Sequence, residues 1–216
     1  MCFSAEASFL AAGVTGAAGI AALARVGTAR EVPLALIPLA FAAQQLMEGG
    51  LWLTLPVAPA GGLSSFLTQA FLVYGLAFWP IFAPFAAWSI ETVPRRRTAI
   101  AACMALGVAL AVYLTATVLT VQHTSCISGG HILYSVETGS PLSLGLLYLL
   151  ATGVALAISS HRAVALLGAI VIVGSVTAHF FYWNAFISVW CFVAAAASGV
   201  ILFHFERARM ARRAAA

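Results

Sequence analysis

The sequence predicts an all-α, polytopic membrane protein with seven transmembrane helices, and three observations carry this prediction. The composition is 63% hydrophobic and only 7% charged, with a mean hydropathy of +1.05, which is typical of membrane proteins. Seven apolar stretches approach or exceed the ~20 residues that cross a ~30 Å hydrocarbon core. The chain contains no lysine, and its ten arginines lie in alternate connections between these stretches.

The seven predicted spans are separated by residues that interrupt helices, such as Gly27, Pro33, Pro94 and Asn184. The sixth and seventh spans are barely separated, so we expect them to form a tight antiparallel pair. No linker or low-complexity segment divides the chain, and we expect residues 1–216 to form a single transmembrane domain. The predicted spans are 4–25, 33–55, 66–90, 98–121, 142–159, 163–183 and 185–206.

The arginines predict the orientation of the chain. Cytoplasmic loops carry the excess of Lys and Arg, so we expect the N-terminus outside, the C-terminus in the cytoplasm and the protein in the plasma membrane. These charges lie beside the membrane with no soluble domain behind them, which favours anionic lipid headgroups as partners and not nucleic acid. The arginines follow the first, third, fifth and seventh spans: Arg25, Arg30, Arg95, Arg96, Arg97, Arg162, Arg207, Arg209, Arg212 and Arg213.

The second span carries the most informative polar residues. Gln45, Glu48 and Trp52 are spaced i, i+3 and i+7, which places them on one helical face, and Gln44 lies beside them. At 1.5 Å per residue, Glu48 lies about 22 Å along the helix from its inner end, in the outer half of the membrane. A buried carboxylate is costly unless it is neutral, paired or ligating. A functional role and a structural hydrogen bond both remain open for Glu48.

Other polar residues also lie toward the outer ends of their spans, whereas the inner halves consist mostly of Ala, Leu, Val and Gly. This asymmetry predicts a polar chamber that opens to, or is capped from, the outside. Ser and Thr in membrane helices also bond back to their own carbonyls, and Trp52 fits an interfacial aromatic belt. The residues concerned are Tyr113, Thr117 and Thr120 in the fourth span, Ser175, His179 and Tyr182 in the sixth, and Asn184, Ser188 and Cys191 in the seventh.

The exterior loop 122–141 is too long for an ordinary structureless connection, so we expect it to be ordered or functional. Gly129-Gly130 offers a tight turn just before His131, and Tyr134 follows three residues later. We expect the loop to fold back as a lid, with His131 and Tyr134 lining the chamber. A mobile surface loop is the alternative. Cys126 and Cys2 are both expected outside, where a disulfide between them is permitted.

Three functions fit these residues. The first is an outward-facing polar chamber that binds a small molecule or ion for transport or sensing. The second is an intramembrane metal- or thiol-dependent enzyme, with Glu48, His131 and His179 as ligands or bases and Cys191 or Cys2 as a thiolate. A metal site needs three or four converging ligands. The third is an accessory subunit of a membrane complex.

Three motifs resemble an uncharacterised family of small bacterial multi-helix membrane proteins that begin Met-Cys-Phe-Ser. The motifs are Met1-Cys2-Phe3-Ser4-Ala5 followed by Ala7-Ser8-Phe9, Gln44-Gln45 with Glu48-Gly49 and Trp52, and Trp190-Cys191-Phe192. The resemblance covers the whole chain. It implies a bacterial inner membrane and draws attention to Cys2, Ser4, His131 and Trp190 besides the second span, but it implies no reaction.

The composition excludes two other seven-helix groups. A retinal protein needs a lysine for its Schiff base, and the chain has none. Seven-helix zinc hydrolases of the ceramidase and progestin-receptor type use Asp with Ser and three His. The chain has no Asp and no His-x-x-x-His pair, so the likeness to these enzymes is one of topology alone.

Overall fold

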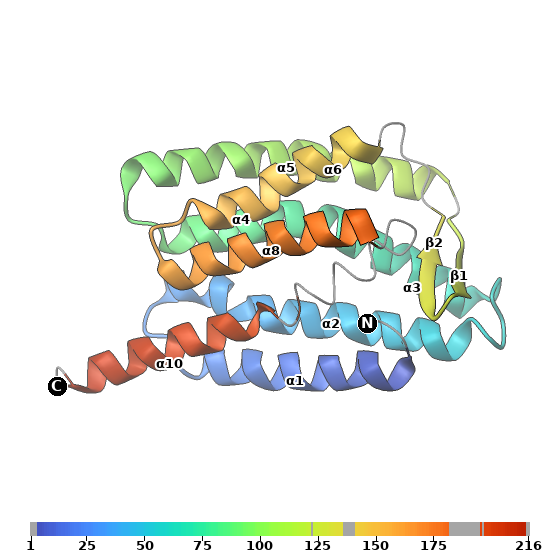
Figure 1. Ribbon diagram of the computed structural model, residues 1–216, viewed down its shortest axis with the longest axis horizontal. Helices are drawn as coiled ribbons and strands as arrows, with labels where there is room; N and C mark the ends of the chain where they lie inside the picture. The colour runs from blue at the N-terminus through green and yellow to red at the C-terminus, as the bar shows by residue number, and fades with distance from the viewer. Residues whose placement is uncertain (1–3, 122, 136–140, 182–194, 196, 215–216) are drawn as a thin grey trace.

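The computed structural model is a bundle of helices with one short β-hairpin (Figure 1). It describes residues 4–121, 123–135, 141–181, 195 and 197–214. The elements are α1 (Ala5–Leu23), η1 (Ala29–Glu31), α2 (Val32–Thr54), α3 (Gly62–Val73), η2 (Tyr74–Phe78), α4 (Trp79–Ile90), α5 (Pro94–Thr120), β1 (Ser125–Ser128), β2 (His131–Tyr134), α6 (Pro141–Leu149), η3 (Leu150–Val154), α7 (Ala155–Ala157), α8 (Arg162–Phe181) and α10 (Gly199–Ala214).

Several of the described helices could cross a membrane, as the composition predicts. Five are long and apolar enough by length and composition: Ala5–Leu23, Ala29–Thr54, Gly62–Ile90, Pro94–Thr120 and Arg162–Phe180. A shorter apolar helix covers Leu142–Ala157. The predicted seventh span, 185–206, lies partly outside the described residues. The helices are therefore compatible with a multi-pass membrane protein.

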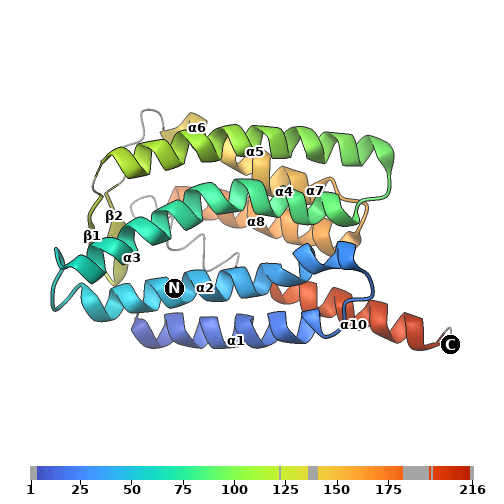
Figure 2. The same ribbon diagram turned by 180° about the vertical axis from the view of Figure 1, so that it is seen from behind.

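Successive helices run in opposite directions, so the connections fall at two ends of the bundle (Figure 1). The connections α1–α2, α4–α5 and α7–α8 lie at one end, together with the C-terminal part of α10. The β-hairpin lies at the other end, as the view from behind also shows (Figure 2). All ten arginines lie at the first of these ends: in the α1–α2 connection, in the first turns of α5 and α8, or in α10. We call this end the arginine end and the other the hairpin end.

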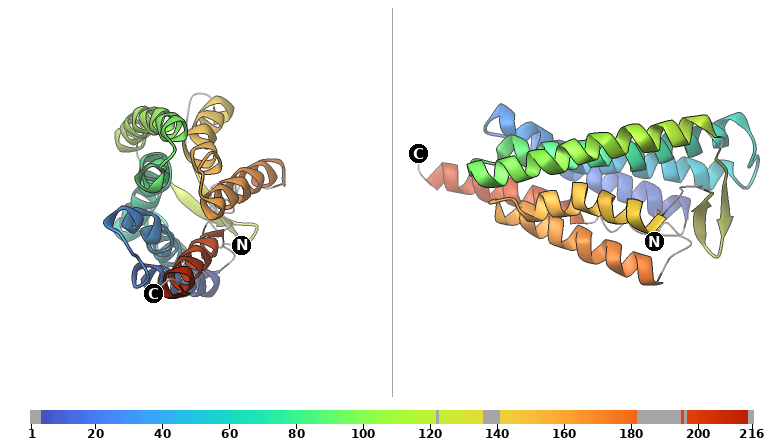
Figure 3. Two further views of the ribbon diagram at one scale, coloured as in Figure 1. Left: turned by 90° about the vertical axis from the view of Figure 1, so that its left-hand side faces the viewer. Right: turned by 90° about the horizontal axis from the view of Figure 1, so that it is seen from above.

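The packing of α1 against α2 is antiparallel and close. A Cβ atom on Gly16 would lie 3.6 Å from the Cβ of Ala42, and one on Gly49 would lie 2.8 Å from the ring of Phe9. Viewed along its axis, the bundle has α4 between α2 and α5, α8 across from them, and α10 between α1 and α8 (Figure 3). The helices around α4 therefore enclose the core.

Two helices contain a π-helical turn that was not predicted from the sequence. In the helix that covers 62–90, η2 ends two residues before Pro80, whose missing N–H leaves a carbonyl without its helical partner. Tyr148, on α6, donates a 2.6 Å hydrogen bond to the carbonyl of Gly75 within η2. The second π-helical turn, η3, interrupts the helix of 141–157. Proline and π-turns are common causes of helix distortion.

Part of the loop 122–141, which was predicted to be exterior, is a β-hairpin of β1 and β2, so the fold is not purely helical. Gly129 and Gly130 have φ values of 58° and 76°, which fits a two-residue turn with positive φ at both positions. The register pairs Ser128 with His131 and Ser125 with Tyr134. The predicted tight turn at Gly129-Gly130 is thereby confirmed.

The last helix ends later than the sequence analysis predicted. We expected a helix end at 206 with four arginines beyond it, but α10 continues to Ala214 and contains them. Arg and Ala are strong helix formers, and no Gly or Pro stops the helix there. Arg25 forms an ion pair with Glu206 of α10, and Arg212 donates a 2.6 Å hydrogen bond to the carbonyl of Arg25.

Candidate functional site

The polar residues of α2 are inside the bundle. Gln44, Gln45 and Glu48 are each 0% exposed, and Trp52 is half-buried. They occupy the part of α2 that lies toward the hairpin end (Figure 1). We call Gln45, Glu48 and Trp52 the α2 polar face.

Gln44 has a defined structural partner. Its side-chain oxygen accepts a 2.7 Å hydrogen bond from the indole N–H of Trp79, at the junction of η2 and α4. The Trp79 ring stacks on Phe41, one turn below Gln44 on α2, with 3.9 Å between the ring centroids. Gln44 was assigned to the predicted chamber, but its bond with Trp79 of the third span was not predicted. The structure places Gln44 in a bond between two helices.

Gln45 differs from Gln44 in its hydrogen bonding. Among the residues that the structure describes, neither amide atom of Gln45 has a hydrogen-bond partner, and the same holds for the indole N–H of Trp52. Burying such a group without a partner costs about 1–3 kcal/mol, and most buried polar side chains are paired. Unpaired donors and acceptors on one helical face are therefore available to a bound molecule.

Ser8 of α1 adds another hydroxyl to this region. It is 1% exposed, and within the described part of the chain its Oγ has no hydrogen-bond partner. The antiparallel register of α1 and α2 places Ser8 within one helical turn of Glu48 along the bundle axis. Ser8 belongs to the first family motif, but it was not assigned to the predicted chamber. Its place on the inward stripe of α1, with Ala12, Thr15 and Gly19, is the signal that could have found it.

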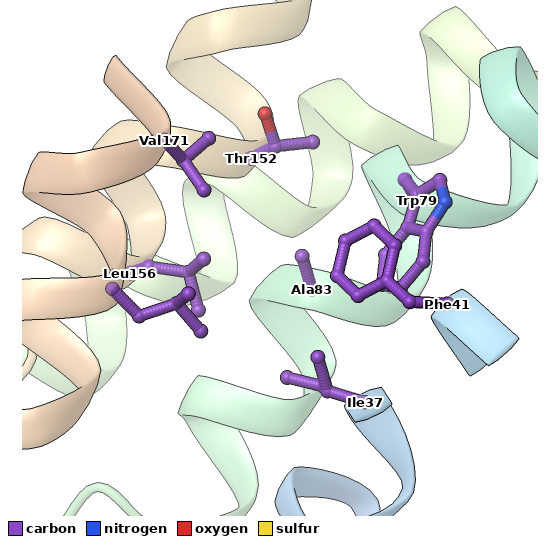
Figure 4. A pocket seen from close by; sticks show the side chains of 8 residues that line it. Ile37, Phe41, Trp79, Ala83, Thr152, Leu156 and Val171 are labelled. Atoms are coloured by element: carbon purple, nitrogen blue, oxygen red, sulfur yellow. The ribbon is translucent and has the colours of Figure 1, made fainter. Parts of the chain in front are cut away.

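A small apolar cavity lies on the other side of the Phe41–Trp79 pair. Its volume is about 20 Å³, and Figure 4 shows the Trp79 ring nitrogen pointing away from it. The one polar side chain in its lining belongs to Thr152, whose hydroxyl donates to the carbonyl of Tyr148 at 2.8 Å. The cavity is lined by Ile37, Phe41, Trp79, Ala83, Thr152, Leu156, Leu167 and Val171. The stacked rings thus lie between the polar side chains and an apolar interior.

The hairpin is attached to the end of α3. Tyr134 stacks on Phe71 with 4.8 Å between ring centroids, and the hydroxyls of Thr68 and Ser125 are 2.7 Å apart. Ile132 is fully buried. These contacts show that residues 125–134 are packed on the bundle. A lid function for the loop stays a prediction.

The predicted histidines lie at the same end. His131 is half-buried at the start of β2, and burial lowers its pKa below the ordinary value. His179 is half-buried near the end of α8, with its ring edge-to-face with Phe180 at 5.6 Å. Within the described part of the chain, no three His, Cys, Asp or Glu side chains form a group that could hold a metal ion. A metal site using Glu48, His131 and His179 would therefore need a different arrangement or further ligands.

The predicted cysteines give less information. Cys126 is exposed on β1, opposite Leu133. Cys2 and Cys191 lie outside the described residues, as do Tyr182, Asn184, Ser188 and Trp190. The Cys2–Cys126 disulfide and the role of Cys191 remain predictions.

The polar stripe of the fourth predicted span does not face the interior. Tyr113 and Thr120 are exposed on α5, and the buried face of this helix carries Gly107, Leu110 and Leu114 instead. The Thr120 hydroxyl donates to the carbonyl of Ala116 at 2.8 Å. The alternative interpretation, a bond back to the same helix, is correct for this residue. This stripe does not line a chamber.

Sequence analysis missed a second buried carboxylate, Glu91, at the arginine end. It is 2% exposed and accepts hydrogen bonds from the backbone N–H groups of Val93 at 2.9 Å and Ser160 at 2.7 Å. The hydroxyl of Ser160 donates to it at 2.7 Å. Burial raises the pKa of Glu91, but the bonds from Ser160, Val93 and Ser159 outweigh this effect and hold it at about 2. Glu91 therefore ties the α4–α5 connection to the α7–α8 connection.

The chain belongs to the family of unknown function DUF6629, whose model matches residues 1–216. A search of curated proteins and a search of solved structures each give no match. The family match is consistent with the resemblance to an uncharacterised family. A function has to be argued from the chemistry of the site.

Proposed function

We propose that this member of DUF6629 is a plasma-membrane protein whose α2 polar face binds a small molecule or ion, for transport or sensing. In this proposal the site is entered from the hairpin end, which faces outward, and seven helices span the membrane with the C-terminus inside. The observation that carries the proposal is the side chain of Gln45. It is fully buried in a helix long enough to cross the membrane, and among described residues neither amide atom has a partner.

The burial of polar groups supports binding more than a purely structural role. Gln44, next in the chain, shows how this bundle satisfies a structural amide, through the bond from Trp79. Gln45 has a donor and an acceptor left over, and Trp52 and Ser8 have further unpaired polar atoms within the described residues. A ligand that pairs with these groups removes the cost of leaving them unpaired. Polar groups inside a membrane protein commonly mark substrate or ion pathways.

The closed packing below the α2 polar face supports entry from the hairpin end. Phe41 and Trp79 are 4% and 3% exposed, and their rings stack between the polar residues and the apolar cavity. A Cβ atom on Gly107 of α5 would lie 1.8 Å from the carbonyl oxygen of Pro80, so α5 and α4 are in direct backbone contact near this level. Among the described residues, both features favour entry from the hairpin end over entry from the arginine end.

The arginines support the proposed orientation and a second, lipid partner. Arg95, Arg207 and Arg213 are exposed at the arginine end, and the Arg97 guanidinium lies 4.1 Å from the centre of the Trp88 ring. Clustered arginines at one membrane face attract anionic headgroups, at about 1 kcal/mol per residue near the surface. We propose that this end lies against the cytoplasmic leaflet.

A ligand screen by thermal unfolding tests the proposed function. The purified protein in nanodiscs is heated with a library of small neutral, anionic and cationic compounds, since a ligand that binds only the folded state raises the melting temperature. We expect at least one compound to stabilise the wild type and to lose this effect in Gln45→Leu. Gln69→Leu is the matched control, because Gln69 instead donates to the carbonyls of Val118 and Val121 at the hairpin end.

Glu48→Gln separates function from folding in the same screen. Gln is nearly isosteric with Glu and keeps hydrogen bonding but cannot ionise. We expect this variant to fold with a melting temperature close to that of the wild type and to bind the compound more weakly. If no compound distinguishes the wild type from Gln45→Leu, the proposed function is wrong, and an accessory role in a larger complex takes its place.

A further inference from the structure

We infer that the ligand of the α2 polar face is a small primary ammonium compound that also carries a hydrogen-bond acceptor, as an amino alcohol does. This inference rests on the proposed function and adds the chemical class of the ligand. It follows from the charges, the hydrogen-bond capacity and the aromatic group of the α2 polar face and its neighbour Ser8.

The charges favour a cation. Glu48 is an acidic residue buried at this level of the bundle, whereas all ten arginines lie in segments at the opposite end (Figure 1). The chain has no lysine, and its arginines all lie at the other end, so an anionic ligand would add a second negative charge in a region of low dielectric without an arginine or lysine at its level, which is costly. A cationic ligand stabilises an ionised Glu48 and is stabilised by it.

The hydrogen-bond capacity favours an ammonium group over a divalent metal ion. Ca²⁺ binds six to eight oxygen ligands, and Mg²⁺ requires octahedral coordination. The buried oxygen groups of the α2 polar face and Ser8 are the Glu48 carboxylate, the Gln45 amide oxygen and the Ser8 hydroxyl. An ammonium group has three N–H donors, and these three acceptors match that number.

Two donors at the site require an acceptor on the ligand. The amide nitrogen of Gln45 and the indole nitrogen of Trp52 are buried, and in the described part of the chain neither has a hydrogen-bond partner. A simple alkylammonium ion would leave both unpaired. A hydroxyl oxygen beside the ammonium group accepts from one of them, which is why an amino alcohol fits better than an alkylamine. The indole face of Trp52 adds an attraction for cations when it is desolvated.

Four probes of similar size separate these contributions. Ethanolamine, protonated at neutral pH, carries the ammonium and the hydroxyl; n-propylamine lacks the acceptor; 1,2-ethanediol lacks the charge; and glycolate carries the opposite charge. Thermal unfolding is measured with each probe in nanodiscs of phosphatidylglycerol, which contain no amine headgroup. We expect ethanolamine to stabilise most, propylamine less, and ethanediol and glycolate not at all.

Two variants identify the groups involved. Because Glu48→Gln removes the counter-charge, we expect its Kd for ethanolamine to be at least about tenfold weaker, which corresponds to about 1.4 kcal/mol. Gln45→Leu removes the amide oxygen and the amide N–H donors. We expect it to weaken the binding of ethanolamine more than the binding of propylamine. Glu91→Gln is the charge-matched control at the arginine end, and it is expected to leave the Kd for ethanolamine unchanged.

The ammonium group could belong to a free amine or to an ethanolamine lipid headgroup. Repeating the titration in nanodiscs that contain phosphatidylethanolamine distinguishes the two sources. If the headgroup is the ligand, these nanodiscs stabilise the wild type but not Glu48→Gln, and added ethanolamine has little further effect. If the ligand is free in solution, ethanolamine stabilises the protein equally in both lipids. Either result supports the ammonium chemistry.

The inference and the proposed function fail in different ways. The inference is wrong if glycolate or ethanediol raises the melting temperature as much as ethanolamine does. It is also wrong if ethanolamine still raises the melting temperature of Glu48→Gln as much as that of the wild type. If only neutral or anionic library compounds bind in a Gln45-dependent manner, the proposed function stands without the inference. If nothing binds in a Gln45-dependent manner, both are wrong.

Discussion

The indole N–H of Trp79 donates a 2.7 Å hydrogen bond to the side-chain oxygen of Gln44 between two helices of the bundle. The same indole ring stacks on Phe41, which lies one turn from Gln44 on α2. One aromatic side chain thus joins α2 to the start of α4 and separates the α2 polar face from the apolar cavity. Gln44 thereby differs in its hydrogen bonding from Gln45, the next residue in the chain, whose amide atoms have no partner among the described residues.

Trp79→Phe tests this arrangement. Phe keeps a ring to pack on Phe41 but cannot donate to Gln44, so a buried amide oxygen loses its donor. We expect the free energy of unfolding to fall by about 1–3 kcal/mol. Trp88→Phe is the matched control, because Trp88 lies at the arginine end under Arg97, where a cation–π contact contributes about 0.5–1 kcal/mol. Equal effects in both variants would contradict the assigned role of Trp79.

Gly107→Ala tests the close contact of α5 with α4. A Cβ at this position would lie 1.8 Å from the carbonyl oxygen of Pro80, so the two helices must move apart. We expect a loss of about 4 kcal/mol or more, the range reached only by severe disruptions. Gly145→Ala on α6, where nothing lies within 4 Å of the added atom, is expected to be neutral or slightly stabilising. Thermal unfolding of both variants in detergent measures the difference.

Glu91 makes the stability of the arginine end depend on pH. Its pKa of about 2 lies below the ordinary value of 4.5. The stabilising contribution of its carboxylate is therefore fully present above pH 4.5 and is lost as the pH falls toward 2. We expect Glu91→Gln to lower the melting temperature at pH 7 and to converge with the wild type in acid. Glu6→Gln is the control: Glu6 is exposed in the first turn of α1, so solvent screens its charge and we expect a much smaller change in melting temperature.

The arginine distribution predicts the side of the membrane on which the C-terminus lies. All ten arginines lie at one end of the bundle, which we place in the cytoplasm by the positive-inside rule. A fluorescent protein fused after Ala216 should therefore fluoresce in cells, and alkaline phosphatase fused there should be inactive. Active phosphatase from this fusion would reverse the orientation and place the α2 polar face on the inner side.

Hydropathy located the described apolar helices well because the length of an apolar run is a local property of the chain. The second predicted span, 33–55, differs from α2 by one residue at each end. Composition alone did not reveal the later end of α10, since Arg and Ala continue a helix beyond the apolar region. The turn of the hairpin requires positive φ values at Gly129 and Gly130. The Gly-Gly pair therefore predicted the turn, but the two strands beside it were not predicted.

The candidate site was harder to predict because spacing shows which residues share a face but not where that face points. The stripes of α2 and α5 have similar spacing, yet Glu48 is buried and Thr120 is exposed. A threonine can face the outside by bonding to its own helix, whereas a glutamate cannot be satisfied in this way. The partners of Gln44 and Glu91 come from distant segments, so no local pattern could identify them.

Cysteine accessibility at position 45 tests the central claim most directly. Gln45→Cys is made in a variant that lacks the four native cysteines and is treated from the outside with impermeant methanethiosulfonate reagents, one cationic and one anionic. Reaction rates are normalised to a variant that retains only the exposed Cys126, and Leu34→Cys, fully buried near the arginine end of α2, is the negative control. We predict that position 45 reacts, that the cationic reagent is favoured by at least about tenfold, and that Glu48→Gln removes this preference. A position 45 that is as unreactive as position 34, or that reacts only from the inner side, would contradict a ligand site open to the outside.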